Sequence, residues 1–128
     1  IEVLNEYAQL PIISAKPLPR DVRKRLPERL HSNSNAHVLL AVDDGTVAGV
    51  AVCFSGFSTF TAMPLLNVHD LAVRATHKGA LLDAVAEKAR SLDCCRVTLE
   101  VDSENENARR LYERKGFEVA QLFMRKPL

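Results

Sequence analysis

The sequence has no tryptophan, few aromatic residues and only three cysteines, two of them adjacent as Cys94 and Cys95. Three thiols cannot form the disulfide framework that stabilises small secreted domains, and no Cys/His spacing here matches a zinc site. We therefore expect a reducing, cytoplasmic environment and no bound metal. Cys53, Cys94 and Cys95 are expected to pack as small apolar residues.

An excess of charge of one sign is also absent, because 17 Lys and Arg residues stand against 16 Asp and Glu residues. Such a balance attracts neither nucleic acid nor an anionic membrane, so any basic site must be local. No apolar run approaches the roughly 20 residues that a membrane helix needs. No charged segment followed by an apolar one opens the chain as a signal peptide would. We expect a single domain over residues 1–128 that acts on neither nucleic acid nor membrane.

Two helices are expected near the N-terminus. Apolar side chains recur at helical spacing over Ile1–Leu10, and Pro11 ends the pattern. Arg20–Leu30 repeats an apolar residue every four positions and is expected to form the second helix. Its other side chains are mostly basic, namely Arg23, Lys24, Arg25 and Arg29. Such a face is usually solvated, and the alternative is contact with an acidic acceptor.

A β-hairpin is expected next. The apolar runs Val38–Val42 and Val47–Phe54 flank Asp43-Asp44-Gly45, which is a tight-turn signal. The following segment, Ser55–Pro64, mixes small hydroxyl residues with phenylalanines and is interpreted as a loop. Its aromatic residues either plug the edge of the core or form the wall of a substrate pocket.

The second half of the chain has the pattern of a βαβ unit. Leu66–Val73 and Cys94–Asp102 are predicted strands, and Gly79–Leu92 between them is a predicted amphipathic helix. The crossover makes the two strands parallel neighbours in one sheet. Strict alternation in the first strand predicts Val68, Asp70 and Ala72 on one side and Asn67, His69, Leu71 and Val73 on the other.

The last predicted helix opens with the capping box Ser103-x-x-Glu106 and ends at Gly116. Asn105, Ala108 and Tyr112 follow one another at spacings of three and four residues, so they share one face of it. Small Ala108 leaves room between two polar groups for an elongated ligand, and the alternative is that this face packs on the sheet. Phe117–Leu128 is expected to return as a final strand.

This order of elements, together with the motif Asn105-x-x-Ala108-x-x-Leu111-Tyr112-x-x-x-Gly116-Phe117, resembles the GNAT superfamily of acetyl-CoA-dependent N-acetyltransferases. The resemblance covers about Val38 to the C-terminus and is strongest in Leu66–Val73, Cys94–Val101 and the motif itself. It implies an α/β fold whose central sheet is mixed and mostly antiparallel, with helices on both faces and a splayed pair of parallel strands. It also implies acetyl-CoA as cosubstrate.

The resemblance further implies roles for two residues of the motif. Asn105 would hydrogen-bond the pantetheine arm of acetyl-CoA, with Ala108 leaving space for it. Tyr112 would be the general acid that protonates the departing thiolate of coenzyme A. A neutral phenol suits this role because it keeps its proton at physiological pH.

The strand Leu66–Val73 would supply the rest of the reaction centre. His69 is the candidate base that deprotonates the amine, since imidazole titrates near neutral pH. The alternative is a buried structural histidine. Leu71, Ala72 and Val73 would bind acetyl-CoA, with the N–H groups of Leu71 and Val73 on the pantetheine amide and the developing oxyanion.

The junction His77-Lys78-Gly79-Ala80 would hold the pyrophosphate of acetyl-CoA at a helix N-terminus, with Lys78, Gly79 and Ala80 as its ligands. The family has a longer loop here, Arg/Gln-x-x-Gly-x-Gly/Ala, and this chain is about five residues short of that binding mode. Either the junction is a true deletion or residues are missing between Ala75 and Leu81. A true deletion would favour a catalytically silent module that binds a ligand or partner.

The acceptor implied by the resemblance is a small primary amine, acetylated by direct attack in a ternary complex. An amine of a protein or peptide is the alternative. The family also implies a homodimer, which the sequence alone does not test.

Overall fold

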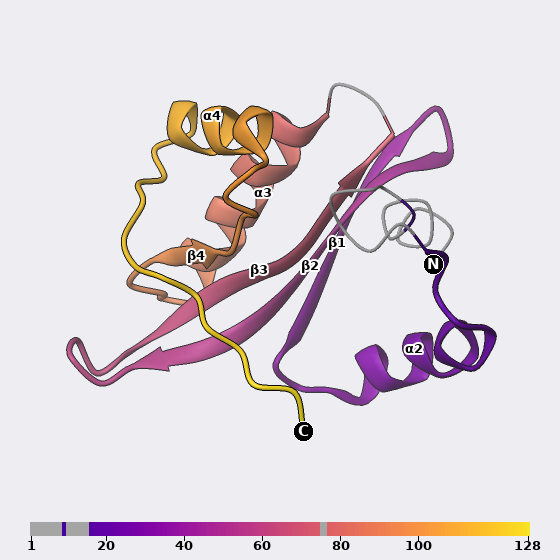
Figure 1. Ribbon diagram of the computed structural model, residues 1–128, viewed down its shortest axis with the longest axis horizontal. Coiled ribbons are helices and arrows are strands. Elements are labelled where there is room, and N and C mark those ends of the chain that lie inside the picture. Colours follow the sequence, from indigo (N-terminus) through magenta and orange to yellow (C-terminus); the bar gives the residue numbers. More distant parts are fainter. Residues whose placement is uncertain (1–8, 10–15, 75–76) are drawn as a thin grey trace.

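The computed structural model describes residues 9, 16–74 and 77–128 of the chain, and the predicted helix over Ile1–Leu10 falls almost wholly outside them. Within the described residues, three helices and four strands follow one another (Figure 1). They are α2 (Arg20–Ser32), β1 (Ala36–Asp43), β2 (Thr46–Ser58), β3 (Met63–Val73), α3 (Lys78–Ser91), β4 (Val97–Leu99) and α4 (Glu106–Arg114). None of these helices has the length and apolarity to span a bilayer.

The strands form one sheet in the order β1-β2-β3-β4. The pairs β1·β2 and β2·β3 are antiparallel, and β3·β4 is parallel. Helices α3 and α4 lie on one side of this sheet, and α2 lies on the other (Figure 1). The expected α/β architecture, with a mixed, mostly antiparallel sheet and helices on both faces, is confirmed.

The two hairpins differ in how well the sequence predicts them. The first turns at Asp44 and Gly45, which both have positive φ, at 49° and 76°, as a two-residue hairpin turn requires. The segment Ser55–Pro64, by contrast, is a loop only at its tip, between Ser58 and Met63. Its pairing with β3 continues through Ser58 opposite Met63, because the hydroxyl and aromatic residues tolerate a strand as well as a loop. Phe60 at the tip is 96% exposed and does not plug the core.

A β-bulge at His69 divides β3 into two halves. Val52 pairs with Asp70 and Cys53 pairs with Val68, so His69 is one extra residue in β3. The bulge reverses the alternation of the strand. Val68 therefore shares a core cluster with Leu71, while Ala72 lies in the cluster on the other face. The strict alternation predicted from the sequence, with Val68 and Ala72 on one side, is wrong for this reason.

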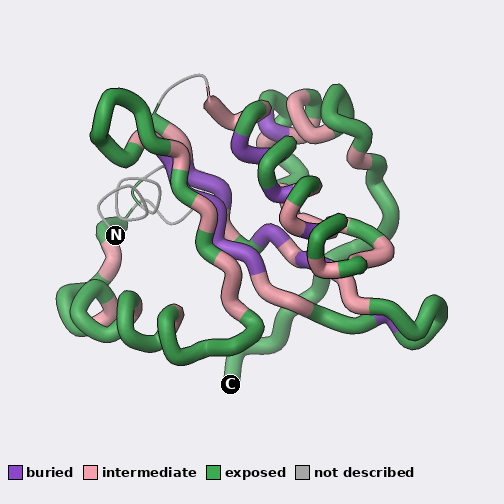
Figure 2. Tube along the Cα trace, turned by 180° about the vertical axis from the view of Figure 1, so that it is seen from behind, coloured by how far each residue is buried: buried purple, intermediate pink, exposed green. Residues whose placement is uncertain are grey.

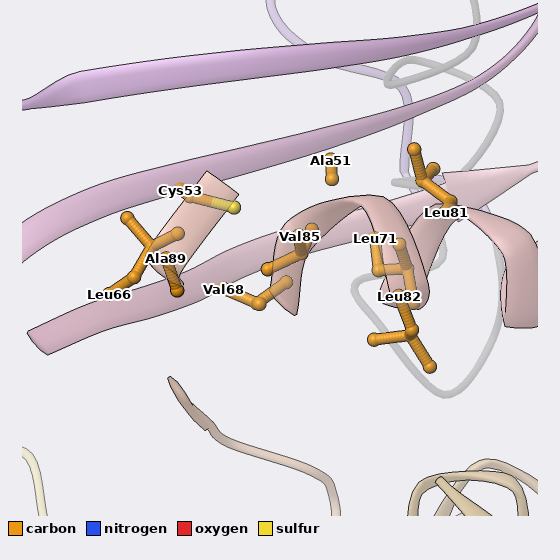
Figure 3. Packing of buried hydrophobic residues seen from close by; sticks show 9 residues of the cluster. All are labelled: Ala51, Cys53, Leu66, Val68, Leu71, Leu81, Leu82, Val85 and Ala89. Atoms are coloured by element: carbon orange, nitrogen blue, oxygen red, sulfur yellow. The ribbon is translucent and has the colours of Figure 1, made fainter. Parts of the chain in front are cut away.

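The larger core cluster joins α3 to the sheet. Leu81, Leu82, Val85 and Ala89 of the helix pack on strand residues that include Leu66 and Val68 (Figure 3). Leu66 and Val85 are fully buried, and burial of each such side chain contributes about 1.5–3 kcal/mol. Buried positions concentrate on β2, β3 and α3 (Figure 2). This packing fixes the start of α3 next to the end of β3.

Three expectations about the C-terminal third need correction. Strand β4 is limited to Val97–Leu99, although the alternation predicts Cys94–Asp102. Helix α4 is capped by Asn105 in place of Ser103, since the Asn105 Oδ1 accepts from the Ala108 N–H at 3.2 Å. Phe117–Leu128 forms no strand, because the short β4 offers no ladder long enough to hold it (Figure 1). Gly116 does end α4 with a φ of 92°, as predicted.

Candidate functional site

The half of β3 after the bulge has a free edge. In the first half, the Leu66 N–H donates to the Arg96 carbonyl oxygen at 3.1 Å, on the β4 side. An even number of residues later, the Arg74 N–H donates to the Ala48 carbonyl oxygen at 2.8 Å, on the β2 side. Alternate N–H groups of a regular strand point the same way, so the bulge has reversed their direction.

The reversal turns two N–H groups away from β2. Ala72 and Arg74 are two residues apart in the strand, so their N–H groups point the same way. The Ala72 N–H therefore also donates to β2. The N–H groups of Leu71 and Val73 therefore point toward the β4 side. There β4 has already ended, because the last pair between the two strands is Val68 with Leu99. Among the described residues nothing pairs with this stretch of the β3 edge, so a ligand can bind there as a strand would.

His69 and Asp70 lie at the bulge on the α2 side of the sheet. The exposed His69 ring meets Phe54 edge to face, with ring centres 5.6 Å apart. Asp70 is half-buried, and burial raises the pKa of its carboxyl, although the neighbouring His69 opposes the shift. An imidazole open to solvent and a carboxyl that resists ionisation thus lie next to each other on the strand.

Tyr112 lies on α4 and packs against the core cluster that contains Leu71. Its ring meets Phe117 at 5.9 Å, and the Phe117 N–H donates to the Tyr112 carbonyl oxygen at 3.0 Å. Burial raises the pKa of the Tyr112 phenol, so the group stays protonated well above neutral pH. Within the described residues no side chain or backbone group is hydrogen-bonded to its hydroxyl. The arrangement suits a proton donor.

Asn105 and Ala108 both have structural roles at the start of α4. The side-chain oxygen of Asn105 caps the helix, so only its amide N–H groups are left for a ligand. Ala108 is buried, with 8% of its surface exposed. These contacts agree with the packing alternative of the sequence analysis and restrict what the two residues can give to a ligand.

Lys78, Gly79 and Ala80 form the first turn of α3. His77 precedes this turn without a side-chain cap, and the turn contains no acidic residue. Its N–H groups and the helix dipole therefore favour an anion. Within the described part of the junction the chain is continuous from His77 into the helix. The break predicted between Ala75 and Leu81 is therefore absent from His77 onward, and residues 75 and 76 lie outside the described residues.

A lysine far away in the sequence also reaches this turn. Lys115, at the end of α4, lies so close to Gly79 that a Cβ there would come within 3.0 Å of the Lys115 Cε. The Lys115 Nζ pairs with Asp83 Oδ2 at 3.0 Å. Sequence reasoning misses Lys115, because only the packing of α3 beside α4 brings the two together. The turn thus has a lysine–aspartate ion pair beside it.

A shallow hollow of about 230 Å³ adjoins the same end of the sheet. Its lining residues come from the first hairpin and the start of α3, and they are Ala41, Val42, Asp43, Ala48, His77 and Ala80. His77 Nε2 and Asp43 Oδ2 are 3.4 Å apart across it.

Comparisons with known proteins agree on one family. The sequence model of the acetyltransferase (GNAT) family matches residues 3–117, whereas no curated protein matches the chain. Two similar solved structures represent the fold. The ribosomal-protein-alanine N-acetyltransferase of Brucella melitensis biovar Abortus 2308 is 21% identical, with a TM-score of 0.76 over 99% of this chain and 88% of that one. An aminoglycoside acetyltransferase from an uncultured soil metagenomic sample, solved with sisomicin, is 14% identical, with a TM-score of 0.80 over 99% and 86%.

The family model covers most of the chain, and the sheet with its parallel pair and flanking helices is the fold of these acetyltransferases. The chain therefore belongs to the acetyltransferase (GNAT) family of acyltransferases.

Proposed function

We propose that this acetyltransferase moves the acetyl group of acetyl-CoA to a small primary amine by direct attack in a ternary complex. The observation that carries the proposal is the bulge at His69, which turns the N–H groups of Leu71 and Val73 into an edge that β4 does not reach. An extended amide chain such as pantetheine can pair with that edge as an added strand.

The donor is held at three places in this proposal. The N–H groups of Leu71 and Val73, with Ala72 between them, bind the pantetheine arm and the thioester oxygen. Lys78, Gly79 and Ala80 bind the phosphates at the first turn of α3, and the Lys115 ammonium, which is paired with Asp83, lies beside that turn. Asn105 donates from its side-chain amide N–H groups, because its oxygen is already used in the cap.

His69 is the proposed base. A free amine is mostly protonated near neutral pH, so a group that accepts its proton lowers the cost of attack on the thioester carbon. His69 is exposed, which leaves it open to the acceptor, and it follows directly after the closed half of the strand. Its contact with Phe54 favours one ring orientation.

Tyr112 is the proposed acid. As the C–S bond breaks, the thiolate of coenzyme A takes up a proton, and a phenol with a raised pKa is protonated and ready to give it. Packing against Phe117 and the core holds the ring in place. The hydrogen bond from the Tyr112 phenol to the thiolate sulfur would form only when acetyl-CoA is bound.

The test is an assay of coenzyme A thiol release over a panel of amines, with mass spectrometry of the acetylated product. We expect amine-dependent release with at least one small primary amine. A peptide amine as the better substrate would favour the second candidate, an enzyme of protein or peptide amines. The similarity to a ribosomal-protein-alanine N-acetyltransferase supports this alternative only at the level of the fold.

A silent binding module is the third candidate, and the short junction before Lys78 is the observation that favours it. A ligand that binds only the folded state raises the melting temperature, so millimolar acetyl-CoA must shift the thermal unfolding of an active enzyme. No shift and no release with any amine would favour the silent module.

We further propose that residues 1–128 act as one domain in the cytoplasm, without a metal, on small acceptors and not on nucleic acid or membranes. The three free thiols and the near-neutral charge support this. A homodimer is the expected assembly, and light scattering would test it.

A further inference from the structure

Helix α2 has a concentration of positive charge that the rest of the chain does not share. Its basic residues are Arg20, Arg23, Lys24, Arg25 and Arg29, and its acidic residues are Asp21 and Glu28. The whole chain, in contrast, has a formal net charge of only +1. The excess on α2 is therefore local.

Most of these basic side chains have no ion-pair partner among the residues that the structure describes. Arg25 pairs with Asp21 at 2.8 Å, but among the described residues Arg20, Arg23, Lys24 and Arg29 form no ion pair. On α4, two of the arginines are paired along the helix, Arg109 with Glu113 at 3.5 Å and Arg110 with Glu106 at 3.3 Å. Both helices are exposed to solvent, so exposure alone does not explain the difference.

The unpaired arrangement has a cost. Arg20 and Lys24 are four positions apart, as are Arg25 and Arg29, and like charges at this spacing destabilise a helix by about 0.2–0.5 kcal/mol per pair. Glu28 is four positions after Lys24 but forms no ion pair within the described residues, so it offsets this repulsion only in part. An anionic ligand would offset the rest.

The position of α2 relates this charge to the reaction centre. Leu26 and Leu30 pack on the cluster of Val50, Val52 and Ala72, and Phe54 packs on the same cluster. Phe54 in turn contacts the His69 ring. At 100° per residue, Arg23 and Arg29 lie on opposite flanks of Leu26, each about 60° from it. One arginine therefore lies on each side of the apolar contact, whereas Glu28 lies on the opposite face of the helix.

We propose that the unpaired basic face of α2 is an acceptor subsite that binds anionic groups, so that the preferred amine belongs to an acidic molecule carrying carboxylate or phosphate. This inference rests on the proposed amine acetylation and names its substrate class. The same face repels polycations, which separates this chain from the acetyltransferase of similar fold that was solved with sisomicin, an aminoglycoside.

The experiment compares acceptors that differ only in charge. The peptide amides Ala-Asp-Asp and Ala-Asn-Asn are nearly isosteric, O-phosphoethanolamine and ethanolamine form a small-molecule pair, and sisomicin is the polycation. For the wild type we expect the acidic member of at least one pair to have a kcat/KM about 10-fold higher. The pair that shows it identifies the source as a peptide carboxylate or a small phosphate. High salt should reduce the preference, because exposed charges are screened.

Variants place the effect on α2. Arg23→Gln with Arg29→Gln should lower kcat/KM for the acidic acceptor by about 3-fold to 10-fold and leave the neutral acceptor unchanged. Arg90→Gln and Arg110→Gln are matched controls, since both are exposed, paired helical arginines on the other side of the sheet. They should change neither value. Glutamine is a good helix former, and circular dichroism checks that α2 is intact.

Two results would overturn the inference. One is an equal or lower kcat/KM for both acidic acceptors in the wild type, and the other is an acidic preference that survives the double variant. Fluorescence anisotropy of C-terminally labelled peptides separates this inference from the proposed function. Selective binding of the acidic peptide without any transfer would contradict only the catalytic proposal, whereas transfer without acidic preference would contradict only the subsite.

Discussion

The two halves of β3 have the same neighbour on one side and different surroundings on the other. Before His69, the strand is paired with both β2 and β4, and its Leu66 N–H is bonded to Arg96. After His69, β2 is its only partner among the described strands, and the N–H groups of Leu71 and Val73 point to the open side. One extra residue separates a structural half from a half that can bind a ligand.

The comparison teaches how a sheet can offer a binding edge in its interior. A parallel neighbour normally uses every second N–H group of a strand. The pairing with β4 ends before Leu71 and Val73, so an acceptor oxygen on a ligand can take the place of the missing strand. Core packing is not lost, because the bulge returns Leu71 to the same cluster as Val68.

The largest effect is expected from deletion of His69, which removes the extra residue. Val68 and Asp70 already lie opposite the adjacent residues Cys53 and Val52, so the shortened strand can alternate regularly and the N–H groups of Leu71 and Val73 keep their direction. We expect acetyl transfer to fall by about 100-fold to 10,000-fold through loss of the base, while acetyl-CoA still raises the melting temperature. His69→Gly keeps the extra residue and removes only the imidazole, so it should lose transfer to the same extent. A deletion variant that no longer responds to acetyl-CoA would show that the open edge depends on the bulge itself.

Tyr112→Phe should have the next largest effect, because it keeps the packing on Phe117 and removes only the proton. We expect kcat to fall by about 10-fold to 1000-fold, with little change in acetyl-CoA affinity. Steady-state kinetics with a slow and a fast amine measure this. An unchanged kcat would remove Tyr112 from the mechanism.

His69→Ala tests the base at the boundary between the two halves. For the wild type, the pH profile of kcat/KM should have an acidic limb along which activity rises with pH, since only the neutral ring accepts a proton. In the variant this limb should move or disappear. If the same limb persists, it belongs to the amine or to another base.

Asp70→Asn should have the smallest effect, and its sign follows from burial. A carboxyl whose pKa is raised by folding costs stability when it is ionised, so its cost is absent below the ordinary value of 3.8 and is fully present above the raised pKa. The variant should therefore be more stable than wild type at pH 7, by a modest amount because His69 opposes the shift, and equal to it at low pH. Thermal melts at several pH values check this. A less stable variant at pH 7 would show that the attraction to His69 outweighs burial.

The sequence predicts the elements of the fold better than the details that form the site. The helical stripe of α3 and the Asp44-Gly45 turn are strong local signals, and both are confirmed. The bulge has no such local signal, because the residues around His69 would look the same in the sequence if the strand were regular. Lys115 beside Gly79 is also invisible in the sequence, since it depends on how α3 and α4 pack.

Two further differences have the same origin in tertiary context. Ser103 and Asn105 can each cap a helix, and the structure uses Asn105, whose Oδ1 accepts from the Ala108 N–H. Phe117–Leu128 has the composition of a strand but no partner of sufficient length in β4. Propensity alone decides neither case.

The most direct test of the account is residue-resolved amide hydrogen exchange of the free protein and of the protein with acetyl-CoA. Leu66 and Ala72 are bonded within the sheet and should be protected in both states. Leu71 and Val73 should exchange faster than Ala72 in the free protein and become protected with acetyl-CoA. Equal protection of Leu71, Ala72 and Val73 in the free protein, with no change on addition of acetyl-CoA, would contradict the open edge after His69.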